Sequence, residues 1–251
     1  MEHEQPLEGG NATAGVVRVG DTVRKPWERS TPAVHELMRT VSAAGVDVPR
    51  PLGRDAQGRQ ILEYVPGTPA LQSPWLTLDE LARVGAMLRA IHDACEGFRP
   101  SAEPGWVPLI PPPGDDGDLV CHGDLTPWNL VLGERWVFID WDGAAPSTRL
   151  WDLAYSAQAF TLNDAEEHPA TAAPRLAALV DGYGANEALR ERLPEAMAER
   201  TEAMHELLRR SHQEGREPWG TMFMTGHGEH WRAVADHVTR HRETWARALR
   251  R

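Results

Sequence analysis

The strongest constraint on the fold is a change of sequence pattern at Pro66-Gly67. Before this point, short β-rich runs are joined by tight-turn signals such as Gly20-Asp21, with one helical segment among them. After it, apolar residues recur at helical spacing, and a capping box at Thr77-Leu-Asp-Glu80 opens the first long helix. The pattern predicts an α+β chain with two lobes. A small β-rich N-terminal lobe would span 1–67 and a large, mainly helical C-terminal lobe would span 68–251.

Individual elements follow from the same patterns. In the N-terminal lobe we expect strands at 16–19 and 22–25, a helix at 32–44 capped by Ser30 or Thr31, and a buried strand at 60–65. In the C-terminal lobe we expect a helix from residue 78, short strands at 119–120, 129–132 and 136–139, and helical stretches at 150–161, 173–212 and 228–249, with breaks at 182–184 and Pro194. Residues 63–67 would form the hinge between the lobes.

Composition excludes several classes of protein. The chain has 251 residues, of which 41% are hydrophobic, and no apolar run approaches the ~18 residues of a membrane span. Met1 to Gly10 carries three glutamates and does not resemble a secretory signal, and Cys95 and Cys121 form no CxxC pair. We therefore expect a cytoplasmic globular protein with no membrane partner.

The charge is concentrated in one part of the sequence. Residues 101–200 carry 17 acidic and 6 basic side chains, a difference that equals the net charge of −11 of the whole chain. A nucleic-acid partner is not expected, because phosphate binding requires a basic face. An acidic region instead favours a divalent metal or a cationic substrate.

Two neighbouring segments carry the clearest chemical pattern. Residues 121–129 read CHGDLTPWN, and residues 138–142 read FIDWD after a short hairpin. Phosphoryl transfer requires a carboxylate that accepts the proton of an attacking hydroxyl, and hard oxygen ligands that hold Mg²⁺ against the phosphates. Asp124, Asn129 and Asp140 supply this set, because the hairpin returns Asp140 to the side of Asn129.

Lysine usage is also unusual. Of the 26 basic side chains, only Lys25 is a lysine, and it lies on the second expected strand. Arg24 faces the opposite side of that strand and would take its place if the register shifted by one residue.

These segments resemble the aminoglycoside phosphotransferase family, which consists of small-molecule kinases with the protein-kinase-like fold. The resemblance rests on His122-Gly-Asp124-Leu-x-x-x-Asn129, on Ile139-Asp140 and on Trp151-Asp-Leu-Ala154. It includes the N-lobe order of hairpin, helix, connector at 48–51 and hinge at 62–67, and it spans roughly residues 9–155. From residue 160 onward only helical character is recognisable.

The resemblance implies ATP and Mg²⁺ as cofactors, bound through a catalytic loop at 121–129 and a metal loop at 138–143. It implies that Asp124 is the catalytic base, that His122 braces the catalytic loop, and that Lys25 grips the α- and β-phosphates. The remaining implied roles are metal binding by Asn129 and Asp140, phosphate covering by Asn11, Ala12 and Thr13, and adenine binding by the backbone of Glu63, Tyr64 and Val65.

Some positions depart from the family pattern or stay open. The family glutamate that pairs with the lysine falls near His35, with Glu36 adjacent, so the partner of Lys25 is undetermined. Asp142 either joins the metal site or caps the following loop. Trp128 and Trp141 are candidate walls of the cleft.

The expected activity is transfer of the γ-phosphate of ATP to a hydroxyl of a small, amine-bearing molecule. An aminoglycoside-like antibiotic or an amino-alcohol metabolite would fit, and in the first case the enzyme would confer antibiotic resistance. The acidic region predicts a cationic or neutral acceptor. Candidate contributors to that charge are Asp115, Asp116, Asp118, Asp164, Glu166 and Glu167.

Two alternatives stay open from the sequence. A metal-dependent hydrolase would use a cluster built from His122, Asp124, Asp140 and Asp142, with His227 and His230 as further candidates. A catalytically silent nucleotide-binding module would use the same fold without turnover. The sequence determines neither the acceptor nor the oligomeric state.

Overall fold

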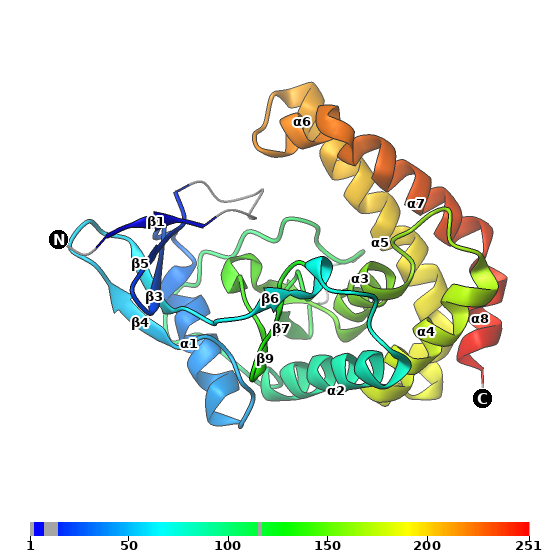
Figure 1. The fold of residues 1–251 in the computed structure, drawn as a ribbon, viewed down its shortest axis with the longest axis horizontal. Helices are drawn as coiled ribbons and strands as arrows, with labels where there is room; N and C mark the ends of the chain where they lie inside the picture. Colours follow the sequence, from blue (N-terminus) through cyan, green and yellow to red (C-terminus); the bar gives the residue numbers. More distant parts are fainter. Residues whose placement is uncertain (1–2, 8–14, 115–116, 251) are drawn as a thin grey trace.

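The computed structural model describes residues 3–7, 15–114 and 117–250, and it has the α+β, two-lobed architecture that the sequence predicts (Figure 1). The N-terminal part contains a five-stranded antiparallel sheet in the order β1-β2-β3-β5-β4. Its strands are β1 (Gln5–Pro6), β2 (Val17–Val19), β3 (Thr22–Lys25), β4 (Pro51–Arg54) and β5 (Gln60–Glu63). The hairpin at Gly20-Asp21 joins β2 to β3 as expected, with Val19 opposite Thr22.

Helix α1 (Thr31–Ala43) packs beside this sheet and begins one residue earlier than expected. Its buried residues Val34, Leu37, Met38 and Val41 follow helical spacing and enter the core. Neither expected cap makes a side-chain capping bond. The Thr31 hydroxyl instead accepts a hydrogen bond from the Glu28 N–H at 2.9 Å, which folds the preceding turn.

Strand β5 ends at Glu63, two residues before the expected end, because the chain leaves the sheet there. The Tyr64 N–H donates to the Asp21 carbonyl oxygen at 3.0 Å, and the chain then enters β6 (Thr68–Pro69). Gly67 has φ of 151°, and a Cβ there would lie 2.4 Å from the Leu132 carbonyl oxygen. Only glycine therefore fits at this crossing between the N-terminal sheet and the rest of the chain.

Two small sheets carry the segments that the sequence singles out. Strand β6 pairs with β8 (Leu130–Leu132), which forms a hairpin with β9 (Trp136–Phe138). Strand β7 (Leu119–Cys121) pairs with β10 (Ala145–Ser147). These pairings bring residues 121–129 and 138–143 to the same side of the C-terminal part, as the hairpin argument predicts.

Helices make up most of the remaining chain. They are α2 (Leu78–Ala94), α3 (Arg149–Thr161), α4 (Pro169–Tyr183), α5 (Glu187–Glu214), α6 (Trp219–Met222), α7 (Gly228–Arg240) and α8 (Arg242–Leu249), with single turns at Ala70–Gln72, Trp141–Gly143 and Phe223–His227. The capping box at the start of α2 forms as expected, since the Thr77 hydroxyl accepts from the Glu80 N–H and the Glu80 carboxylate accepts from the Thr77 N–H.

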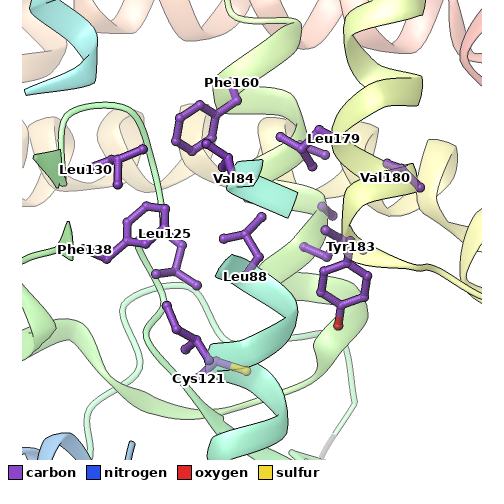
Figure 2. Close-up of a cluster of buried hydrophobic side chains, with 14 of the residues drawn as sticks. Val84, Leu88, Cys121, Leu125, Leu130, Phe138, Phe160, Leu179, Val180 and Tyr183 are labelled. Atoms are coloured by element: carbon purple, nitrogen blue, oxygen red, sulfur yellow. The ribbon is translucent and has the colours of Figure 1, made fainter. Parts of the chain in front are cut away.

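Helices α2 and α4 cross at two glycines. A Cβ on Gly85 would lie 2.0 Å from the Leu179 carbonyl oxygen, and one on Gly182 would lie 1.9 Å from the Ala82 carbonyl oxygen. The two backbones are therefore in direct contact. Figure 2 shows the apolar core beside this crossing, where Leu88, Leu125 and Phe138 pack together from α2, the catalytic-loop segment and β9.

Two helix breaks differ from expectation. Pro194 lies inside α5 without ending it, because Leu193, Pro194 and Met197 are buried together and this packing outweighs the backbone hydrogen bond that proline cannot make. The stretch expected at 228–249 is divided at His241 into α7 and α8. Among the described residues, no helix combines the length and apolarity needed to cross a membrane.

Candidate active site

Asp124 lies in the loop between β7 and β8 and accepts three side-chain hydrogen bonds. The Asn129 amide nitrogen donates to Oδ2 at 2.7 Å, and the Trp128 indole N–H donates to the same oxygen at 3.2 Å. The Thr126 hydroxyl donates to Oδ1 at 3.2 Å. The carboxylate orientation is therefore fixed by neighbours five residues or fewer away in the sequence.

The environment of Asp124 also changes its acidity. Burial raises the pKa of Asp124 to about 6, against the opposing effect of the hydrogen bond from Trp128. The negative charge of Asp140 raises this pKa further. A carboxylate with such a pKa is a better proton acceptor than an exposed aspartate and is still largely ionised at neutral pH.

His122 has the bracing geometry that the resemblance implies. Its ring is fully buried, Nε2 donates to the Ile139 carbonyl oxygen at 3.1 Å, and Nδ1 accepts from the Asp124 N–H at 3.2 Å. Burial lowers the pKa of His122, so the ring is neutral at pH 7. The histidine thus joins the catalytic-loop segment to the end of the β9 segment and has no proton to supply to a substrate.

A second buried network supports the same loop from behind. The Asp152 carboxylate on α3 accepts from the Gly123 N–H at 3.1 Å and from His92 Nε2 at 3.0 Å. His92 Nδ1 lies 2.9 Å from the Tyr183 hydroxyl. In the sequence Asp152 is distinguished only as part of the family motif, and its contact with the loop backbone is visible only in the structure.

Asp140 occupies a strained position beside Lys25. It has φ of 66° and ψ of 58°, the left-handed region, which is uncommon for a residue other than glycine. The Lys25 ammonium contacts the Asp140 carboxylate directly and lies 2.5 Å from Asp142 Oδ2. Lys25 is only 6% exposed and faces this site, whereas Arg24 faces Asp55 on the other side of β3, so the expected register is correct.

The three charges adjust one another. Burial alone would lower the pKa of Lys25, but the Asp140 and Asp142 carboxylates raise it above its usual value. Burial would likewise raise the pKa of Asp140, and Lys25 holds it below its usual range. Lys25 and Asp140 are therefore both charged near neutral pH.

The partner of Lys25 is not on α1. His35 Nε2 lies 3.1 Å from Gln60 Oε1, and the Glu36 carboxylate accepts from Ser101. The Gln60 amide nitrogen in turn donates to Asp142 Oδ1 at 2.9 Å and to the Pro26 carbonyl oxygen at 3.0 Å. Contacts through Gln60 and Asp142 thus link His35 to Lys25.

Gln60 is a site residue that the sequence reasoning missed. The sequence feature that marks Gln60 is a long polar side chain in a strand that is predicted to be buried. In the sheet Gln60 lies directly opposite Lys25, and its side chain is buried. Buried amides need hydrogen-bond partners, so this position could have been flagged.

The hinge residues differ in what their backbone can offer. The Glu63 N–H donates to the Arg50 carbonyl and the Tyr64 N–H to the Asp21 carbonyl, so both donors are used. Within the described part of the chain, the Val65 N–H has no backbone partner and is the free hinge donor. Asn11, Ala12 and Thr13 lie outside the described residues, as do Asp115 and Asp116.

The two candidate wall tryptophans have different places. Trp141 is fully buried, stacks edge-to-face on His122 and donates to the Phe138 carbonyl, so it is a core residue and the expectation of a cleft wall was wrong. Trp128 is half-buried and belongs to an aromatic cluster with Tyr155 on α3 and Trp231 on α7. That cluster lies between the catalytic loop and the C-terminal helices.

The residues of the alternative hydrolase site do not assemble. Both nitrogens of His122 are engaged in hydrogen bonds, and His230 bonds to Asn163 at 3.2 Å. In the described ranges, the group of possible metal ligands that comes together is His92, Cys121 and Asp152. In this group the Asp152 carboxylate already accepts hydrogen bonds from Gly123 and His92. Burial raises the pKa of the Cys121 thiol.

Sequence comparison agrees with this geometry. A family model described as the phosphotransferase enzyme family matches residues 103–191, which include the catalytic and metal loops. The trifolitoxin immunity protein of Rhizobium leguminosarum bv. trifolii is 30% identical over 200 residues, a match that covers 73% of this chain and 75% of the relative. The chain belongs to the phosphotransferase enzyme family. It is thus a small-molecule phosphotransferase, as the sequence motifs predict.

Solved structures share the fold of this phosphotransferase at low sequence identity. A microcompartment-associated aminopropanol kinase superposes with a TM-score of 0.68 at 12% identity and covers 98% of this chain and 94% of its own. The amicoumacin kinase hAmiN, solved with AMP-PNP and Ca²⁺, superposes with a TM-score of 0.65 at 13% identity and covers 94% of this chain and 90% of its own. Both likenesses extend over the helical region after residue 160, where the sequence carries no recognisable motif.

Proposed function

We propose that this phosphotransferase transfers the γ-phosphate of ATP to a hydroxyl of a small, amine-bearing molecule. The observation that carries the proposal is the meeting of three distant segments at one point: Asp124 with Asn129, the left-handed Asp140, and Lys25 from β3. Phosphoryl transfer depends on positioning and on charge neutralisation, and these residues supply both.

In this proposal Asp124 orients the acceptor hydroxyl and takes its proton. Its oxygens already accept from Thr126, Trp128 and Asn129, and each carboxylate oxygen can accept more than one hydrogen bond. The raised pKa of about 6 brings Asp124 closer to the acidity of a working general base.

The donor set fits a divalent cation. Asn129 uses its amide nitrogen for Asp124, which leaves its carbonyl oxygen to act as a ligand, and Asp140 adds a carboxylate. The Lys25 ammonium already stands between Asp140 and Asp142, so this place accommodates a cation. Mg²⁺ held there would neutralise phosphate charge, and hard oxygen ligands are the ones it prefers.

Lys25 would bind the α- and β-phosphates. It must then give up part of its contact with Asp140 and Asp142, which would leave these carboxylates to face the metal. The Val65 N–H would hold the adenine, since the Glu63 and Tyr64 donors are used internally. Asn11, Ala12 and Thr13 would cover the phosphates.

The acidic middle of the chain supports an amine on the acceptor. Asp118 and Asp164 are exposed and unengaged by any described ion pair, whereas Glu167 is already paired with Arg175. A cleft with uncompensated carboxylates attracts cations, and salt screens this attraction over ~8 Å at physiological strength. For an amine acceptor, kcat/KM should therefore fall with added salt. A flat or rising response would remove the electrostatic argument.

The metal assignment has a direct test. Asp140→Asn keeps a side chain that tolerates left-handed geometry and removes the charge. We expect the Mg²⁺ concentration that gives half-maximal rate to rise at least about tenfold, a typical scale for loss of a metal contact. A folded variant with unchanged Mg²⁺ dependence would exclude Asp140 as a ligand.

The remaining parts of the proposal concern organisation and role. Residues 1–67 would form the nucleotide-binding lobe with its hinge at 63–67, and residues 68–251 the lobe that binds the acceptor. Two unpaired cysteines and the need for ATP favour the cytoplasm. The relative is named as a trifolitoxin immunity protein and one structural neighbour as an amicoumacin kinase, which supports a role in resistance to a hydroxylated toxin.

A further inference from the structure

Arg200 is a buried arginine that has no counterion in contact among the described residues. It lies on α5, is 5% exposed, and forms no ion pair with any described residue. Its Nη1 atom is buried and has no hydrogen-bond partner among these residues. Other partly buried arginines are paired, such as Arg190 with Asp181 at 2.8 Å and Arg175 with Glu167 at 3.1 Å. A buried guanidinium without such a partner destabilises the fold. A functional role would account for the presence of Arg200 at this position.

The position of Arg200 connects it to the catalytic loop. Its guanidinium carbon lies 3.8 Å from the centre of the Tyr155 ring. The Tyr155 ring centre is 6.2 Å from that of Trp128, and Trp128 donates to the Asp124 carboxylate. Two aromatic side chains, Tyr155 and Trp128, thus separate Arg200 from the proposed base Asp124. Arg200 lies on the side of the C-terminal helices. The charge of Asp124 acts on Arg200, and the charge of Arg200 on Asp124.

The surroundings limit what Arg200 can bind. Tyr155 covers one face of the guanidinium, and the Trp151 ring centre lies 5.9 Å from the guanidinium carbon. Tyr155 itself belongs to a hydrophobic cluster with Met204, Leu207 and Trp231. A ligand ammonium would be repelled by the fixed positive charge. The N–H groups at the edge of the guanidinium, including those on Nη1, can only donate hydrogen bonds. The matching group on a ligand is therefore an oxygen that accepts them.

We propose that Arg200 determines acceptor specificity by donating hydrogen bonds to a carbonyl or carboxylate oxygen close to the acceptor hydroxyl. The inference rests on the proposed function, because it assigns the acceptor to the side of the catalytic loop that carries Trp128 and Tyr155. Combined with the acidic surface, it describes an amino alcohol that also carries an amide, ester or carboxylate, as in a hydroxylated amino acid or peptide derivative.

Three small acceptors separate the relevant groups. Ethanolamine has the amine and the hydroxyl, L-serinamide adds a carboxamide, and L-serine adds a carboxylate. At saturating Mg·ATP, we expect the wild-type kcat/KM for serinamide or serine to exceed that for ethanolamine by at least about tenfold, since a site built to hydrogen-bond a group rejects the analogue that lacks it. A comparison of kcat/KM for serinamide with kcat/KM for serine shows whether an amide oxygen or a carboxylate oxygen is preferred.

Arg200→Met should reduce this preference to within about threefold, because Met fills similar volume without donors. Arg200→Lys should keep part of the preference for serine and less of that for serinamide, since it keeps the charge and loses the planar fork. Arg190→Met, on the same helix, should leave the preference unchanged. A wild-type enzyme that favours ethanolamine, or an Arg200→Met enzyme that keeps the preference, would overturn the proposal.

Thermal stability gives a second, acceptor-independent test. A buried guanidinium that is retained for ligand binding destabilises the ligand-free protein. The Tm of Arg200→Met should therefore equal or exceed that of the wild type. Arg190→Met, which breaks an ion pair, should lower the Tm. A marked fall of Tm in Arg200→Met would show a structural role and contradict the proposal, and this result decides the case if none of the three acceptors is used. Absence of both transfer and Asp124-dependent ATP hydrolysis would instead contradict the proposed function itself.

Discussion

The Lys25 ammonium lies 2.5 Å from the Asp142 carboxylate, on a loop 117 residues later in the sequence. This contact joins the N-terminal sheet to the metal loop directly, in place of a glutamate on α1. We predict that Lys25→Ala raises the KM for ATP and lowers kcat, because the charge that positions the phosphates is lost. Lys25→Arg should recover only part of the rate, since a planar guanidinium replaces a compact charge.

Arg24 provides the matched control for this prediction. It precedes Lys25 on the same strand and faces Asp55, 3.6 Å away, on the opposite side. Steady-state kinetics of Arg24→Ala should resemble those of the wild type. If Arg24→Ala were the impaired variant and Lys25→Ala active, the assignment of the phosphate-binding lysine would be wrong.

The Gln60 amide should act as a positioning group for Asp142. Its nitrogen donates to Asp142 and to the Pro26 carbonyl, and its oxygen lies against His35. Gln60→Met removes these bonds while keeping the volume, so we expect an approximately three- to tenfold rise in the KM for Mg·ATP, the cost of about one hydrogen bond. Gln57→Met, in the exposed turn before β5, should have no effect. Equal KM values for the two variants would show that Gln60 does not position Asp142.

Asp152 should support the catalytic loop from the side away from the substrate. It accepts from the Gly123 N–H and from His92, and it is 4% exposed. Asp152→Asn presents one oxygen and two donors where two acceptors are needed, so we expect loss of both stability and kcat. Urea denaturation with kinetics on the same samples checks this. A variant with full kcat and full stability would show that the network is dispensable.

The sequence predicted which segments the fold brings together at the candidate site. Asp124, Asn129 and Asp140 could be found because a short hairpin must bring its two ends together, and Lys25 because it is the sole lysine in a strand. The link from Lys25 to Asp142 and Gln60 could not be found, since it depends on how the sheet packs on the metal loop. The family's glutamate position on α1 falls near His35, but His35 contacts Gln60 instead.

The helical region was less predictable for the same physical reason. Pro194 reads locally as a helix break, and only burial against neighbouring helices explains why α5 continues through it. From the sequence Trp141 is a candidate cleft wall beside charged residues, yet in the fold it is buried and packs against His122. Arg200 has no sequence signal at all, because an arginine on a charged helix is ordinary until its burial is known.

The raised pKa of Asp124 predicts a pH-dependent effect on stability. Its pKa is about 6 in the folded protein and lower in the unfolded chain, so the folded state binds the proton more tightly. Ionising Asp124 therefore costs stability as pH rises through this window, and the cost persists above the folded pKa. In metal-free protein without nucleotide, the Tm of Asp124→Asn relative to wild type should be higher at about pH 7.5 than at about pH 4.5. A Tm difference that is the same at both pH values would contradict the assigned acidity.

The most direct test of the account is phosphoryl transfer by Asp124→Asn. Asparagine keeps the shape of the side chain but cannot take the proton of the acceptor hydroxyl, while Lys25, Asn129 and Asp140 are unchanged. We expect kcat to fall by about 100-fold or more, the usual contribution of a general base, with Mg·ATP affinity within about threefold of wild type. A folded variant that keeps more than about a tenth of the wild-type kcat, a difference under about 1.4 kcal/mol in barrier, would contradict the central role given to Asp124.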